Sequence, residues 1–333
     1  MGTSRLSSSP TTVASSAQTQ PVQSPFQVNS LPGAITAQVN TPDGKVAALG
    51  AIIKFSQNNG YFIYQHEDPV LSKKSITLKQ ESDDGKFQIA SIDDQLPDLR
   101  AQRIYIQVHH NPPQRLIIEH LLDHLAESSL GRNNLELKKN VTIDVFDSDA
   151  DAELRDNAGF IVTDRLQLHQ ISVDSDELLK VLKPSKEVTV TLFELKNKNE
   201  KESVLDYDAT LSSHNRAEFL EFLFSQSTVY VARRHNEENV EVVAGYIVAS
   251  KTDNRVLALY AEDQSIADTL LIHHLTQSKA RKAILCTSRS QWRKLSTLKS
   301  LKSRVIYRRH TRSVPSNVKW ERIFAFNAGL NLF

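Results

Sequence analysis

Cysteine is almost absent from this sequence, since Cys286 is the only one among 333 residues. A single cysteine excludes an intramolecular disulfide, which favours a reducing compartment, and we expect a buried structural thiol. Long apolar runs are also missing, and none reaches the roughly 20 residues that a helix needs to cross a bilayer. We therefore expect an intracellular protein, in the cytoplasm or the nucleus, without a membrane partner.

An excess of charge of either sign is lacking as well. The sequence has 40 Lys and Arg residues against 39 Asp and Glu residues, so its net charge is +1 and no global field attracts nucleic acid. Basic residues do gather locally, because residues 269–320 contain no acid. This basic stretch could bind CoA phosphates, an acidic substrate or nucleic acid. It could also dock against the acidic stretch at 144–156, and we favour docking.

The N-terminal segment has few large apolar side chains and no apolar core of a signal peptide. Ser, Thr, Gln, Pro and Ala dominate it, and such a segment cannot bury enough surface to offset the entropy lost on ordering. We expect a disordered tail at 1–25. The remaining length suits two folded domains, which we place at 26–183 and 184–333.

The spacing of apolar residues predicts the secondary structure of the first domain. Residues 66–100 give no clear pattern. Strands are expected at 34–40, 46–55, 61–65, 103–109, 141–146 and 160–172, and helices at 113–128, 150–157 and 174–182.

The second domain repeats part of this order. Strands are expected at 187–196, 204–211, 228–234, 240–250, 255–260, 282–287, 304–310 and 320–327, and helices at 214–225, 264–278 and 290–301. Both halves contain a strand, a long helix, a strand, a short helix and a strand, which indicates a duplicated unit. The strands on either side of each long helix should be parallel, through a right-handed crossover, within a mixed sheet.

That order of elements resembles the core of the acyl-CoA N-acyltransferase (GNAT) fold. The segment "VTIDVFDSDADAELRDNAGF", which ends in Gly159-Phe160, is similar to a strand and helix of that family. The second half resembles the C-terminal domain of tandem proteins of the YitH/HolE type. The matching pieces are Tyr207-Asp208, "NRAEFLEFL", Ala244-Gly245-Tyr246, "LALYAEDQSIADTLLIHHL" and "KWERIFAFNAGLNLF". The resemblance implies an α/β (α+β) fold of two GNAT-like domains, each a mixed central sheet with flanking helices.

The resemblance also implies acetyl-CoA as co-substrate and a small-molecule or peptide amine as acceptor. In this family, backbone N–H groups of a Gly-rich turn at the start of the long helix hold the CoA pyrophosphate. The corresponding turn here, "HHNPPQRLI" at 109–117, has two prolines and no glycine. The residues expected to bind the cofactor are Val108, His110, Gln114 and Arg115.

Catalytic groups are expected near the same turn. His109 follows a strand and could accept a proton from the amine, although a surface histidine is the alternative. Many members of the family use a tyrosine before Gly-Phe as a general acid, and Arg155 stands there instead; its charge could stabilise a thiolate. Asp208 could orient the acceptor amine, or could end a strand. We expect no metal site.

Two functions remain open at this point. The first is an acyl-CoA-dependent N-acyltransferase acting on an unidentified amine, in which backbone N–H groups of strand 103–109 polarise the thioester carbonyl. The second is a catalytically inactive, GNAT-derived binding or scaffold protein that has lost the pyrophosphate loop. The missing glycines of the turn support the latter. At the second long helix, Glu262 and Asp263 are expected to cap the helix and would repel a pyrophosphate.

Overall fold

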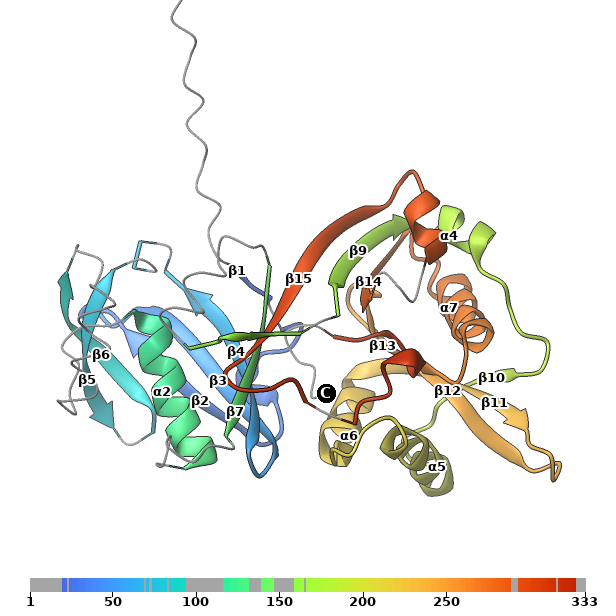
Figure 1. Cartoon of the computed structure of the whole chain (residues 1–333), viewed down its shortest axis with the longest axis horizontal. Coiled ribbons are helices and arrows are strands. Elements are labelled where there is room, and N and C mark those ends of the chain that lie inside the picture. The colour runs from blue at the N-terminus through green and yellow to red at the C-terminus, as the bar shows by residue number, and fades with distance from the viewer. Residues whose placement is uncertain are drawn as a thin grey trace, which may run out of the picture.

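The computed structural model describes residues 20–22, 24–68, 70–71, 74–82, 84–93, 116–131, 139–146, 159–164, 166–288, 293–315 and 317–327. These residues form two lobes that share one mixed sheet (Figure 1). No helix in the described part of the chain is long and apolar enough to cross a membrane.

In the part that the structure describes, the N-terminal lobe is a sheet with helix α2 (Ile117–Leu130) on its face. Its strands are β2 (Ala34–Asn40), β3 (Val46–Ser56), β4 (Asn59–Glu67), β5 (Ser75–Ser82), β6 (Lys86–Asp93) and β7 (Asn140–Phe146). Helix α2 precedes β7 and packs on β2 and β3. Its buried Leu121 and Leu125, four residues apart, share one apolar cluster with Ile52 of β3, so helical spacing creates this contact.

The C-terminal lobe is a sheet with helices on both faces. Its strands are β10 (Thr189–Leu192), β11 (Ser227–His235), β12 (Glu241–Ser250), β13 (Val256–Ala261) and β14 (Lys282–Ser288). Its helices are α5 (Lys198–Ala209), α6 (Ala217–Gln226) and α7 (Gln264–Ser278). Helix α7 and helices α5 and α6 belong to different apolar clusters, which places them on opposite faces. A short helix, α4 (Ser175–Val181), leads into this lobe.

The two lobes exchange a strand with each other. Strand β9 (Leu168–Asp174) precedes the C-terminal lobe in sequence but pairs with β14 of that lobe. Strand β15 (Lys302–His310) follows β14 of the C-terminal lobe in sequence but pairs with β7 of the N-terminal lobe. Strands β9 and β15 pair with each other in the middle, so the sheet continues from one lobe into the other. Figure 1 shows β15 as the long strand that connects the lobes.

Most predicted elements agree with the structure, and the predicted fold class is confirmed by its topology. Helix α7 has the predicted bounds, and β13 and β14 on either side of it are parallel. In the N-terminal lobe the described parallel neighbour of β7 is β4. The strand predicted at 103–109 and the helix predicted at 150–157 lie outside the described residues.

Three predictions differ from the structure. The strand predicted at 204–211 is wrong, because α5 covers most of it. Asn197 caps this helix by accepting a hydrogen bond from the N–H of Glu200, and the buried Val204, Tyr207 and Leu211 follow helical spacing. The single strand predicted at 160–172 is wrong, because the structure has two strands there, β8 (Val162–Thr163) and β9, and the helix predicted at 290–301 is described only as a 3-10 helix, η2 (Arg293–Thr297). The hairpin of β5 and β6 lies within residues 66–100, where apolar spacing shows no clear pattern.

Some residues of the predicted tail are ordered in the structure. Residues 1–19 lie outside the described part, but β1 (Gln20–Pro21) pairs with β7. The domain division at 183 and 184 stays a prediction, since β9 before it pairs with β14 after it.

Candidate functional site

Each lobe contains two parallel strands that pair briefly and then separate, with a long helix between them in the chain. Strand β4 pairs with β7 through residues 59–61 and 140–142. Strand β13 pairs with β14 at Val256 and Leu285. We call the places where these pairs separate the N-terminal fork and the C-terminal fork. Backbone groups beyond a fork cannot pair across it and need other partners.

The C-terminal fork is occupied by the chain itself. Strand β16 (Ile323–Ala325) pairs with β13, with Ala325 opposite Leu259. The N–H of Phe326 donates a hydrogen bond to the carbonyl of Cys286 on β14 at 2.9 Å. Phe326 is 1% exposed and Cys286 is 6% exposed, so the expectation of a buried thiol is confirmed. A segment of the chain therefore contacts both strands of this fork.

The positive end of helix α7 is also occupied by the chain. Asp263 is the N-cap, and its carboxylate accepts hydrogen bonds from the N–H groups of Ser265 at 2.8 Å and Ile266 at 3.0 Å. Burial raises the pKa of Asp263, but these hydrogen bonds together lower it by more, so that its pKa lies below the usual value. The predicted capping of this helix is confirmed for Asp263, and the anion that the helix N-terminus favours is already present.

The N-terminal fork has a buried group of polar residues at its base. The hydroxyl of Tyr61 on β4 donates to Oδ2 of Asp144 on β7 at 2.7 Å. Nε and Nη2 of Arg308, on β15, donate to the two oxygens of Asp144, each at 2.8 Å. Burial lowers the pKa of Arg308, but the charge of Asp144 raises it more, and its pKa lies above the usual value. Side chains of β4, β7 and β15, from both lobes, therefore meet at one buried ion pair and the tyrosine that donates to it.

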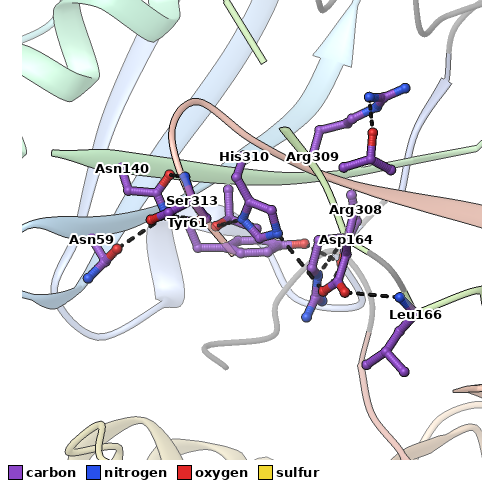
Figure 2. Close-up of polar contacts among 12 residues, drawn as sticks. Asn59, Tyr61, Asn140, Asp164, Leu166, Arg308, Arg309, His310 and Ser313 are labelled. Atoms are coloured by element: carbon purple, nitrogen blue, oxygen red, sulfur yellow. Dashed lines mark hydrogen bonds and ion pairs between the residues drawn. The ribbon is translucent and has the colours of Figure 1, made fainter. Parts of the chain in front are cut away.

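An imidazole lies beside this ion pair (Figure 2). Nδ1 of His310 is 2.8 Å from the hydroxyl oxygen of Thr142, and its Nε2 is 3.9 Å from Oδ2 of Asp164. Burial raises the pKa of Asp164, but the nearby His310, the hydrogen bond that Oδ1 accepts from the N–H of Leu166 and the charge of Arg308 lower it more, so that its pKa lies below the usual value. An imidazole between a hydroxyl and a carboxylate can accept or hold a proton.

An amide network holds the beginning of this fork. Asn140 donates from Nδ2 to Oδ1 of Asn59 at 3.2 Å and to the carbonyl of Ser313 at 2.9 Å. Figure 2 shows these contacts beside Tyr61 and His310. The end of the β4–β7 pairing that lies away from the point of separation is thereby tied to the segment after β15.

The structure describes only one of the predicted site residues. His109, Arg155, Val108, His110, Gln114 and Arg115 lie outside the described residues and stay predictions. Asp208 is described on α5 and is 3% exposed. Both of its carboxylate oxygens accept hydrogen bonds from Arg216, and Oδ1 also accepts one from Tyr246 at 2.5 Å. Asp208 therefore forms an ion pair within the core of the C-terminal lobe.

Sequence analysis missed Tyr61, Asp164, Arg308 and His310 as neighbours. Tyr61 and Arg308 come from opposite halves of the chain, and no local spacing connects them. The sequence signal for this contact was the basic stretch at 269–320, which was expected to dock against the acidic stretch at 144–156. The predicted docking is confirmed at its first residue, because Asp144 binds Arg308. In the part of the chain that the structure describes, no group of three His, Cys, Asp or Glu residues could hold a metal ion.

Comparison with known proteins gives a family match for the N-terminal half. A model described as "Domain of unknown function (DUF7596)" matches residues 18–162. A search of the curated proteins found no match to this sequence.

Several solved structures are similar to most of this chain. A protein from Pyrococcus horikoshii described as an acetyltransferase is 13% identical, with a TM-score of 0.49, over 85% of this chain and 75% of that chain. A GCN5-related N-acetyltransferase from Sphaerobacter thermophilus is 11% identical, with a TM-score of 0.46, over 82% and 80%. A tandem GNAT protein from the clavulanic acid biosynthesis pathway is 8% identical, with a TM-score of 0.45, over 86% of each chain. At these identities the likeness concerns the fold alone.

Proposed function

We propose that this chain is an acyl-CoA-dependent N-acyltransferase of the GNAT type that acts on an unidentified amine. The observation that carries the proposal is the N-terminal fork, where the parallel strands β4 and β7 separate beside Tyr61, Asp144 and His310. Backbone groups beyond the fork can bind the amides and the carbonyl of an extended thioester arm. The charged groups beside it supply the acid–base chemistry that acyl transfer to an amine requires.

The proposed reaction is a direct attack of the amine nitrogen on the thioester carbonyl carbon. A C–N bond forms, the C–S bond breaks, and the proton released by the amine is returned to the CoA thiolate. Backbone N–H groups of β4 polarise the carbonyl in this proposal, and those of strand 103–109 remain a second candidate. His310 is the proposed base among the described residues, and His109 remains a second candidate.

The phosphates of CoA are assigned to the segment before helix α2. The N–H of Leu116, the N-cap of α2, already donates to Oε2 of Glu119 at 2.9 Å, so this group is not available to a phosphate. The predicted residues upstream, above all Gln114 and Arg115, must therefore supply the contacts. A guanidinium suits this position, because it binds phosphate oxygens through two parallel hydrogen bonds.

The C-terminal lobe has a supporting role in this proposal. Its fork is occupied by β16, and its long helix is capped by Asp263. It contributes β15 to the N-terminal fork instead, and with it the side chains of Arg308 and His310. The chemistry is thus assigned to one lobe, with residues from both.

Thermal unfolding with millimolar acetyl-CoA tests this function. A ligand at 100 times its Kd stabilises the folded state by about 2.7 kcal/mol. We expect the wild type to gain in Tm and Arg115→Glu to lose this gain. Lys186→Glu, which changes an exposed basic residue of the C-terminal lobe, is the matched control and should behave like the wild type. If acetyl-CoA leaves the wild-type Tm unchanged, the proposal fails and the non-catalytic scaffold replaces it.

A further inference from the structure

Residues 20–22 lie within the N-terminal fork. Strand β1 runs antiparallel to β7, with Gln20 opposite Phe146 and Pro21 opposite Val145, and the N–H of Val22 donates to the carbonyl of Asp144 at 3.1 Å. The other edge of β7 pairs with β15 at the same residues. Strand β1 therefore lies on the edge that faces β4, and it also lies against β4.

The two forks are filled by opposite ends of the described chain, but not equally firmly. In the C-terminal fork, β16 pairs with β13, and the hydroxyl of Thr287 donates to the carbonyl of Phe324 at 2.5 Å. In the N-terminal fork, β1 has two residues, and Pro21 has no N–H to donate. The side chain of Val22 is buried, at 6% exposed. The N-terminal occupant is thus the shorter and the more weakly bound.

We propose that residues 20–22 are an autoinhibitory segment that competes with the pantetheine arm of acyl-CoA for the N-terminal fork. This inference rests on the proposed function. The pantetheine arm is a single extended chain with two amide groups, so its hydrogen-bonding groups resemble those of a two-residue strand. Both need the same backbone groups of β7, such as the carbonyl of Asp144, and only one of them fits there at a time.

Displacement of this segment also uncovers the proposed chemistry. Val22 belongs to the apolar cluster that contains Tyr61 and Phe146, and Tyr61 hydrogen-bonds to Asp144. When residues 20–22 leave, the base of the fork becomes accessible to the thioester and the amine. The apparent affinity for acyl-CoA is then the intrinsic affinity multiplied by the fraction of molecules in which the segment has left.

Isothermal titration of the full-length chain with acetyl-CoA tests the competition. Val22→Asp places a carboxylate where an apolar side chain is buried, which disfavours the occupied fork. We expect this variant to bind acetyl-CoA at least about tenfold more tightly than the wild type. Gln20→Ala is the matched control, because β1 pairs through its backbone, and it should retain the wild-type affinity.

Hydrogen exchange of the wild type supplies a second measurement that does not depend on the variant's stability. Saturating acetyl-CoA should increase the exchange of the Val22 amide, because its hydrogen bond to Asp144 is broken. Equal affinity of all three proteins, or an unchanged exchange rate, overturns the autoinhibition and leaves the acyltransferase proposal intact. Failure of Val22→Asp and the wild type alike to bind at millimolar acetyl-CoA overturns both.

Discussion

The buried pair of Asp144 and Arg308 gives the sharpest prediction for stability. Asp144→Asn keeps the shape of the side chain but removes its charge, which leaves the guanidinium of Arg308 buried, at 1% exposed, without the carboxylate that it binds through two hydrogen bonds. Removing one partner of such a buried pair costs about 3–5 kcal/mol. Little of this cost comes from packing, because aspartate and asparagine have similar volumes.

This cost converts to a measurable change in Tm. The entropy of unfolding is roughly 2.1 cal/mol/K per residue, so a chain of 333 residues has roughly 0.7 kcal/mol/K. The expected decrease in Tm is therefore about 4–7 °C. Differential scanning calorimetry or circular dichroism can resolve it. The matched control is Asp43→Asn, whose partner Lys45 lies 2.9 Å away but in solvent, and its Tm should stay unchanged.

A double variant separates the charge from the structural role of the site. Asp144→Leu with Arg308→Met replaces the ion pair by apolar side chains, and buried pairs often tolerate such a change. We expect the double variant to be more stable than Asp144→Leu alone or Arg308→Met alone. The reasoning is refuted if Asp144→Asn lowers the Tm by less than about 1 °C, or if the two single costs simply add.

Two further predictions concern the C-terminal lobe. Asp263→Ala should destabilise the protein by about 1 kcal/mol at neutral pH, because two N–H groups of α7 lose their acceptor. The pKa of Asp263 is lowered in the folded state, so its contribution is complete above the ordinary value of 3.8 and is lost as the pH falls through the folded-state pKa. Urea unfolding at pH 7 and pH 3 should therefore show a smaller difference between variant and wild type at the lower pH. Gly245→Val should cost about 1–3 kcal/mol in the same assay, since a Cβ at Gly245 would lie 2.6 Å from the carbonyl oxygen of Tyr260.

The local elements of this protein follow from its sequence. Helix α7 was predicted with its bounds, and Glu262 and Asp263 were predicted to cap it, because apolar spacing and capping residues act within a few positions of each other. Asp263 is the N-cap. Helix α5 shows the limit of this method. The sequence from Val204 to Leu211 also fits an alternating pattern, and only the cap at Asn197 distinguishes the helix.

The candidate site was less accessible to sequence analysis. Six of its seven predicted residues lie outside the described part of the chain. The seventh, Asp208, was singled out by resemblance, and its position depends on Arg216 and Tyr246, which no spacing rule connects to it. Asp144 and Arg308 were included in the predicted docking of acidic and basic stretches, but the sequence offered no reason to select this pair.

By itself the sequence determined most of the strands and helices, because period and capping are local properties. The tertiary structure alone decided which strand edges meet: that β9 and β15 exchange lobes, and that β1 and β16 enter the two forks. The backbone groups of a strand edge are the same whatever the sequence, so any strand can satisfy them. The choice of partner depends on which side chains the whole fold can bury together, and that is a property of the folded chain.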